Sequence, residues 1–228
     1  MLGVRAVCLD LDDTLWPVEP AIVRAEAAMI DWLARHCPRV LERHDAASIR
    51  LLRAEVAAEN PGRLHDLTFL RRTALERAIA GAGYAAAMAD GAFAAFFEAR
   101  NRVDLFDDVL PALERLAARY RLLALSNGNA DLEVIGIAPR FELAVSARDA
   151  GAAKPDAVIF ELMLRRASLA PREVVYVGDD PVADVEGARR AGLHAVWVDR
   201  LGREWPATLA PPAHRVSSLE ELAALLCD

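Results

Sequence analysis

The sequence has almost no lysine. Of its 27 lysine and arginine residues, Lys154 is the single lysine and all the others are arginine. Acidic residues number 34, so the net charge is −7. Proteins that bind nucleic acid or anionic membranes non-specifically carry the opposite excess. The charge balance therefore argues against a nucleic-acid partner and against a membrane partner.

Cysteine is also scarce, and long apolar runs are missing. Cys8, Cys37 and Cys227 are odd in number and far apart, which excludes a disulfide framework and the short spacings of a zinc site. No stretch approaches the roughly 20 apolar residues that span a bilayer. The apolar run at the N-terminus is too short for a secretory signal. We expect a cytoplasmic protein; the sequence does not indicate its oligomeric state.

Apolar residues make up 54% of the 228 residues, which is ample for a folded core. Short apolar runs alternate with helical patterns, which is typical of strands buried on both faces of a parallel sheet. The expected strands are residues 4–9, 121–125, 141–145, 174–177 and 195–198, and the expected helices are 109–118, 155–167, 182–191 and 219–226. This alternation predicts an α/β fold with a doubly wound, Rossmann-like parallel sheet.

The segment from residue 17 to residue 100 breaks this alternation. It is rich in alanine and contains only helical patterns, at about 21–35, 45–59, 67–80 and 85–99. It leaves the sheet at the carboxyl end of the first strand, where open α/β sheets bind ligands. We therefore expect an α-helical cap domain (17–100) inserted into a core domain (1–16 and 101–228), and we expect the cap to act as a lid.

Acidic residues gather directly after the first expected strand. Asp10, Asp12 and Asp13 lie within four residues and are followed by Thr14. Three acids so close repel one another, and they need a cation or a shared proton. Oxygen ligands without histidine or cysteine favour Mg²⁺.

Three further clusters follow other strands or precede a helix. They are Ser126-Asn127 after the second strand, Lys154 before a helix, and Gly178-Asp179 with Asp184 after the fourth strand. A doubly wound sheet brings such positions to one edge. Together they provide what a magnesium-assisted phosphoryl transfer through a carboxylate nucleophile requires.

The order Asp10-x-Asp12-x-Thr14, Ser126-Asn127, Lys154 and Gly178-Asp179 followed by Asp184 resembles the haloacid dehalogenase (HAD) superfamily. The resemblance covers nearly the whole chain, and the helical segment lies where the type-1 cap of that superfamily lies. Within it, Asp10-Leu11-Asp12-Asp13-Thr14-Leu15-Trp16 is similar to the first motif of flavin-nucleotide phosphatases of the riboflavin pathway.

The resemblance implies a role for each matching residue. Asp10 would be the nucleophile and a metal ligand, and Asp12 the general acid/base whose backbone carbonyl also binds the metal. Asp179 would be a further direct metal ligand, and Asp184 an outer or alternate acid. The implied phosphoryl- and substrate-binding residues are Thr14, Ser126, Asn127 and Lys154. Asp13 departs from the glycine that is commonest at its position, and we expect it to cap the turn.

These patterns leave alternatives open. A metal-free 2-haloacid dehalogenase would use Asp10 to displace halide, but such enzymes typically lack the second acid, so Asp12 favours phosphate esters. A non-catalytic phospho-receiver module also gathers acids, a hydroxyl and a lysine around Mg²⁺, in a shorter chain and another order. We expect a phosphatase of small phosphomonoesters, with flavin mononucleotide or its ribityl-phosphate precursor first by resemblance. His65, Asp66, Arg71 and Arg72 are expected to form a solvated helix face.

Overall fold

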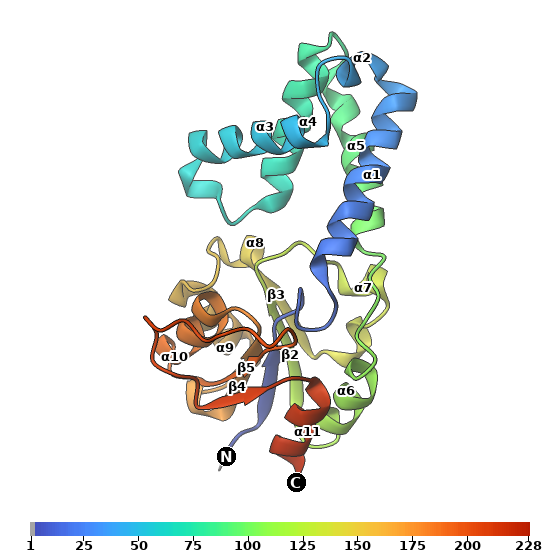
Figure 1. Cartoon of the computed structure of the whole chain (residues 1–228). Helices are drawn as coiled ribbons and strands as arrows, with labels where there is room; N and C mark the ends of the chain where they lie inside the picture. The colour runs from blue at the N-terminus through green and yellow to red at the C-terminus, as the bar shows by residue number, and fades with distance from the viewer. Residues whose placement is uncertain (1–2) are drawn as a thin grey trace. The chain divides into compact units, whose positions relative to one another are not determined.

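A computed structural model describes residues 3–228 and contains one six-stranded parallel sheet (Figure 1). The strands run in the order β3-β2-β1-β4-β5-β6. Their bounds are β1 (Ala6–Leu9), β2 (Arg121–Ser126), β3 (Leu143–Ser146), β4 (Val174–Gly178), β5 (His194–Val198) and β6 (His214–Val216). Strands β1, β2 and β3 follow one another toward one edge of the sheet, and β4, β5 and β6 then follow one another toward the other edge. Because the order reverses between β1 and β4, their carboxyl ends form the switch point at which such sheets bind ligands. The expected α/β fold is confirmed.

The described chain divides into two compact units. The sheet unit consists of the chain through Pro17, Asp104–Gly128 and Gly136–Asp228. The helical unit consists of Val18–Val103 and, in addition, Asn129–Ile135. No sequence pattern signals that this last short segment, which follows Ser126 and Asn127 closely, packs with the helices.

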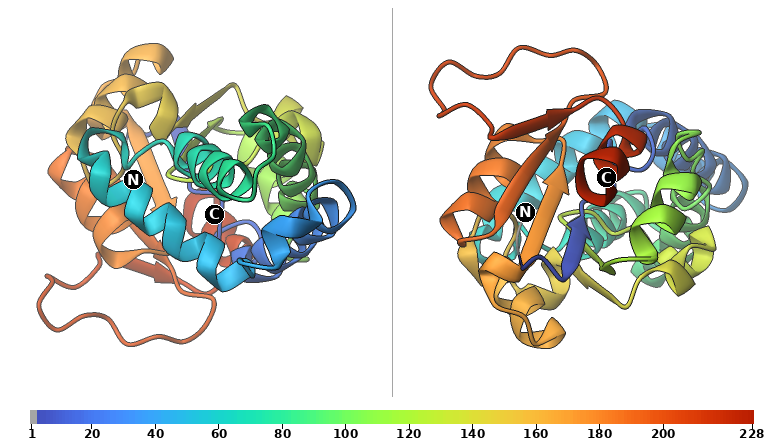
Figure 2. Two further views of the ribbon diagram at one scale, coloured as in Figure 1. Left: turned by 90° about the horizontal axis from the view of Figure 1, so that it is seen from above. Right: turned by 90° about the horizontal axis from the view of Figure 1, so that it is seen from below.

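Helices cover both faces of the sheet in the first unit (Figures 1 and 2). On one face α6 (Val109–Ala117) packs against α11 (Leu219–Cys227), and on the other α9 (Ala157–Ala167) packs against α10 (Gly187–Arg190). The short elements of this unit are α8 (Ala147–Ala150), the 3-10 turns Ala138–Arg140 and Pro171–Glu173, and the π-helix η5 (Pro181–Glu186). The two-sided cover explains why the strands are nearly continuous apolar runs.

Three expectations about these elements need correction. The helix expected at 155–167 was predicted to begin at Pro155, but α9 begins at Ala157, because the Asp156 carboxylate accepts the Val158 N–H at 2.9 Å and acts as the N-cap. The expected helix at 182–191 begins instead as the π-helix η5. The edge strand β6 was not predicted, since a strand of three residues leaves no periodic signal.

The second unit is helical throughout its described elements. Its helices are α1 (Val18–His36), α2 (Pro38–Leu41), α3 (Ala46–Glu59), α4 (Leu67–Gly81), α5 (Ala89–Arg100) and α7 (Leu132–Ile135), with 3-10 turns at Pro61–Arg63 and Ala86–Met88. Helix α1 approaches α5 closely at Gly91, where a Cβ would lie 2.3 Å from the Trp32 ring. Within residues 3–228, no helix combines the length and the apolar character that a membrane crossing demands.

Candidate active site

Asp10 is placed by the backbone pairing of the two central strands. Its N–H donates to the Val177 carbonyl at 2.8 Å, which extends the β1–β4 ladder by one residue. The chain then turns sharply, and Asp13 adopts a φ of +58°. This left-handed conformation favours glycine, which explains why glycine is commonest at this position of the motif that the sequence resembles. The Asp13 N–H donates to the Trp16 carbonyl at 2.8 Å and closes the turn.

Lys154 lies at the centre of the candidate site and is 5% exposed. Its ammonium nitrogen lies 2.5 Å from Asp10 Oδ1, 2.7 Å from Asp184 Oδ1, 2.9 Å from Tyr176 Oη and 3.2 Å from the Leu125 carbonyl. Burial alone lowers the pKa of Lys154, but the two carboxylates outweigh it and hold the pKa above its usual range. Lys154 is therefore a permanently charged, fully bonded cation.

Asn127 holds the backbone that carries Lys154. Its Oδ1 accepts the Lys154 N–H at 2.7 Å, and its Nδ2 donates to the Lys154 carbonyl at 3.0 Å. Both polar ends of the amide are thus engaged, so the structure gives Asn127 a contact with Lys154 where the resemblance implied one with substrate. Ser126 is 4% exposed at the end of β2, and its Oγ accepts the Gly128 N–H at 2.9 Å.

Asp184 is fixed by three neighbours and is 1% exposed. Its Oδ1 contacts Lys154 and accepts the Tyr176 hydroxyl at 2.9 Å, and its Oδ2 accepts the Asp180 N–H at 2.9 Å. The carboxylate lies directly against Gly178, where a Cβ would be 2.3 Å from Asp184 Cγ. Gly178 is therefore required by this close approach.

Asp180 has a role that the sequence left open. Its Oδ1 accepts the N–H groups of Val182 and Ala183, both at 2.7 Å, as the N-cap of the π-helix η5. It therefore fixes the start of the helical turn that carries Asp184.

Asp179 follows Gly178 and is held by two donors. Its backbone carbonyl accepts the Trp197 indole N–H and an Arg203 N–H, both at 2.8 Å. Its carboxylate pairs with Arg203 at 3.2 Å. Burial and the neighbouring Asp184 carboxylate raise the pKa of Asp179 to about 6, although Arg203 opposes the shift. The proton affinity of this carboxylate reflects a site with an excess of negative charge.

Three carboxylates converge at this point. Oxygens of Asp10, Asp179 and Asp184 all lie within 4.8 Å of one another. Burial also raises the pKa of Asp10 well above its usual range, opposed by Lys154 and reinforced by Asp184. An all-oxygen set that retains surplus negative charge fits a hard divalent cation. Asp184, expected just outside the metal ligands, belongs to this group, whereas the Asp12 carboxylate does not.

Asp12 and Thr14 occupy the turn beside Asp10. The Trp16 indole N–H donates to Asp12 Oδ1 at 2.9 Å, and Trp16 is completely buried. The Thr14 hydroxyl donates to Asp10 Oδ2 at a long 3.5 Å and is also buried. Thr14 therefore faces the Asp10 carboxylate, where the resemblance had implied substrate contact.

The sequence patterns missed Tyr176, Trp16 and Arg203. Tyr176 was hidden inside an apolar strand, yet a buried tyrosine hydroxyl demands a polar partner, and that demand was the available signal. Trp16 follows the acidic cluster directly. Arg203 is one arginine among many, and nothing in its local sequence marks it.

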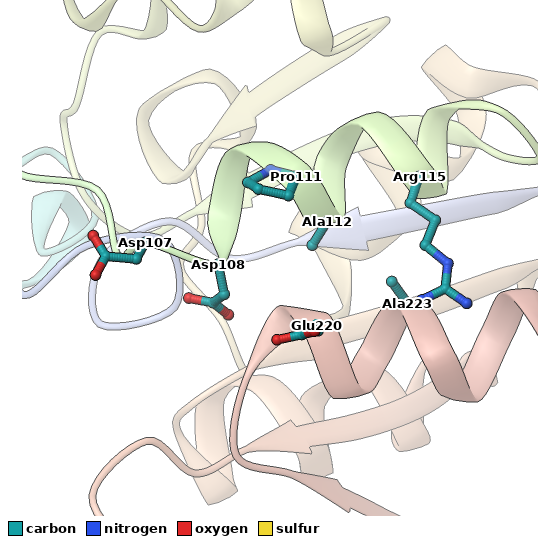
Figure 3. A pocket seen from close by; sticks show the side chains of 7 residues that line it. All are labelled: Asp107, Asp108, Pro111, Ala112, Arg115, Glu220 and Ala223. Atoms are coloured by element: carbon teal, nitrogen blue, oxygen red, sulfur yellow. The ribbon is translucent and has the colours of Figure 1, made fainter.

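A surface pocket of about 390 Å³ lies apart from these residues, between α6 and α11 (Figure 3). It is lined by Asp107, Asp108, Pro111, Ala112, Arg115, Glu220 and Ala223. None of the predicted site residues belongs to it, so it lies outside the candidate active site.

Comparison with known proteins places the chain in a family. The profile of the haloacid dehalogenase-like hydrolases matches residues 4–192. The 5-amino-6-(5-phospho-D-ribitylamino)uracil phosphatase YigB of Escherichia coli is 32% identical over 231 residues, which cover 98% of this chain and 96% of that protein.

Solved structures agree with this placement. One named 2-haloacid dehalogenase, from Pseudomonas syringae, is 38% identical, covers 98% of both chains and superposes with a TM-score of 0.92. A HAD phosphatase from Thermococcus onnurineus, at 23% identity, 98% coverage of both chains and a TM-score of 0.70, shares the fold. By the family profile, the relative and the site together, the chain belongs to the haloacid dehalogenase-like hydrolases.

Proposed function

We propose that this protein is a Mg²⁺-dependent phosphatase that hydrolyses small phosphomonoesters through an aspartyl-phosphate on Asp10. The observation that carries the proposal is the convergence of Asp10, Asp179 and Asp184 within 4.8 Å of one another beside the buried Lys154 ammonium. Mg²⁺ would be held by Asp10, Asp179, the backbone carbonyl of Asp12 and, from the geometry, Asp184. When bound, it neutralises charge on the phosphoryl oxygens.

The chain's own residues account for the two chemical steps. In the first, the Asp10 carboxylate attacks phosphorus, the bond to the ester oxygen breaks, and Asp12 gives its proton to the departing alcohol. In the second, Asp12 takes a proton from water, the water oxygen attacks phosphorus, and the bond to Asp10 breaks to release phosphate. The Trp16 N–H orients the Asp12 carboxylate for both transfers. Lys154 and Ser126 are proposed to bind the phosphoryl group.

A dehalogenase is the second candidate, and the Pseudomonas syringae structure named 2-haloacid dehalogenase supports it. Halide leaves carbon as a stable anion and needs no proton donor. An acid placed two residues after the nucleophile, and held there by a buried indole, serves no purpose in that reaction. Asp12 therefore favours phosphate esters. The phospho-receiver alternative fits poorly, because the chain matches a hydrolase profile over residues 4–192.

The YigB relative acts on a phosphorylated ribitylamino-uracil, by its name. The same riboflavin precursor, followed by flavin mononucleotide, is therefore the first substrate to test here. Phosphate release across a panel of small phosphorylated metabolites would rank these candidates by kcat/KM.

Asp12→Asn tests the acid/base assignment. The variant should lower kcat by about 10²–10⁴-fold on an alkyl phosphate, because its leaving alcohol needs the proton. The loss should be much smaller on 4-nitrophenyl phosphate, since nitrophenolate departs without one. Steady-state phosphate release on both esters measures the difference. Equal losses on the two esters would remove Asp12 from the acid/base role.

A further inference from the structure

Arg71 is a buried cation on helix α4 of the helical unit and is only 7% exposed. The sequence predicted a solvated helix face for Arg71 and its neighbour Asp66, and for these two buried residues that prediction is wrong. Among residues 3–228, no group accepts a hydrogen bond from the Arg71 guanidinium and no carboxylate forms an ion pair with it. A desolvated charge without such partners is costly, and proteins retain one where it has a task.

The charges around Arg71 increase this cost. Burial and the Arg53 guanidinium lower the pKa of Arg71 to about 9; Arg100 contributes in the same direction, and Glu26 opposes it. Glu26, however, already forms an ion pair with Arg50 at 2.6 Å. Glu26 therefore offsets only part of the positive charge that Arg53 and Arg100 place near Arg71.

Phe96 of α5 contacts the Arg71 guanidinium. The guanidinium carbon lies 3.6 Å from the centre of the Phe96 ring. Such stacking occupies the flat face of the guanidinium and leaves the N–H groups along its edge available. A planar edge of parallel N–H donors matches the two oxygens of a carboxylate or phosphate. The Arg71 guanidinium, in contact with Phe96 and without a hydrogen-bond acceptor in the described chain, therefore suits an oxyanion.

The segment Asn129–Ile135 of the helical unit follows Ser126 along the chain and contacts Arg100 of the arginine cluster. Asn129 belongs to the helical unit, where its Oδ1 accepts from Arg100 Nε and its Nδ2 donates to the Thr68 hydroxyl, both at 3.4 Å. It follows Ser126 and Asn127 closely in the sequence. Asn129 therefore ties Arg100 to α4 within the helical unit.

We propose that Arg71 anchors an anion-binding site in the helical unit, flanked by Arg53 and Arg100, that takes a carboxylate or phosphate group. The anion is either a second anionic group of the substrate or a separate small anion. Only the first source rests on the proposed phosphatase function; the existence of the anion site does not.

Arg71→Met tests the site directly. The flexible methionine replaces the stem against Phe96 and removes an unpaired buried charge, so the thermal midpoint without anion should stay level or rise. Malonate, which carries two carboxylates and no phosphorus, should bind the wild-type protein and raise its midpoint. In the variant its affinity, measured calorimetrically, should fall by about 10- to 100-fold. Arg72→Met is the matched control, because Arg72 lies on the same helix and is half-exposed in an ion pair with Asp90; it should keep the malonate affinity.

A pair of esters distinguishes the two sources of the anion. Phosphoglycolate carries a carboxylate, and ethyl phosphate has a methyl group in its place. If the substrate supplies the anion, the wild-type protein should prefer phosphoglycolate, and Arg71→Met should reduce that preference about tenfold or more through KM, while Arg72→Met should keep it. If a separate anion binds, malonate binding should depend on Arg71 while the ester preference does not.

Malonate affinity that is equal in wild type and Arg71→Met, or absent from the wild type, would overturn the anion site. Failure of the proposed phosphatase function has a different signature: the wild-type protein would release phosphate from neither ester, and malonate binding would still depend on Arg71.

Discussion

At the scale of single residues, the positive charge of Lys154 offsets the negative charges of Asp10 and Asp184. Four acceptor atoms lie within 3.2 Å of its nitrogen, and two of them are carboxylate oxygens. A compact ammonium can donate its three hydrogen bonds within a small space, whereas a planar guanidinium needs a wide, flat space. In a chain whose other basic residues are all arginine, the lone lysine thus stands where arginine would not fit.

Lys154→Arg should therefore inactivate the protein although it keeps the charge. The longer fork should displace Asp10 or Asp184, and a misplacement of about 1 Å costs about 100-fold in rate. Turnover of 4-nitrophenyl phosphate measures the effect, with Arg190→Lys on the exposed end of α10 as a control that should remain fully active. An arginine variant with near-normal turnover would show that the lone lysine is a coincidence of composition.

Asp179 should make metal binding depend on pH. Its pKa is raised to about 6, so the folded protein holds a proton there that an unfolded chain has already lost. The stabilisation from this proton is complete below the ordinary aspartate pKa and disappears as the pH rises through about 6. A metal must displace the proton, so Mg²⁺ affinity at about pH 5 should be about tenfold weaker than at about pH 7.5. Calorimetric titration in two buffers measures both affinity and proton release, and an affinity that is flat over this range would contradict the assignment of Asp179 as a ligand.

At the scale of elements, the sequence located the central strands well because a parallel sheet covered on both faces imposes continuous apolar runs. The approach of Asp10, Lys154 and Asp179 was predictable for the same reason, since strand ends of one sheet meet at one edge. Local capping was less predictable: Asp156 rather than Pro155 determines where α9 begins. Side chains that act through burial, such as Tyr176 and Arg71, follow from packing between elements, which no local pattern encodes.

The end of strand β4 offers a test of that packing. Gly178→Ala would place a Cβ 2.3 Å from Asp184 Cγ, so the carboxylate has to move and its bonds to Lys154 and Tyr176 should break. We expect a loss of about 1–3 kcal/mol in the free energy of unfolding together with loss of turnover, measured by urea denaturation and phosphate release. Gly81→Ala, where nothing lies within 4 Å of the new Cβ, is the control and should lower neither, because alanine suits the helical position of Gly81. Unchanged unfolding of the Gly178 variant would mean that Asp184 is not held as described.

At the scale of the whole molecule, the comparisons point toward two chemistries on one fold. The YigB relative is a phosphatase by name, and the Pseudomonas syringae structure is a dehalogenase by name. Fold similarity does not decide between them, because both reactions begin with an aspartate nucleophile. Under the proposed function the site favours phosphate esters, because Asp12 supplies a second acid and the cluster of Asp10, Asp179 and Asp184 suits a divalent metal.

The most direct test is to assay both reactions on the same wild-type protein. Phosphate release from 4-nitrophenyl phosphate and chloride release from 2-chloropropionate would be measured with Mg²⁺ and with EDTA. The proposed function predicts phosphate release that requires Mg²⁺, stops in EDTA and returns when Mg²⁺ is restored, with no chloride released in any condition. Chloride release that persists in EDTA, without phosphate release, would contradict it.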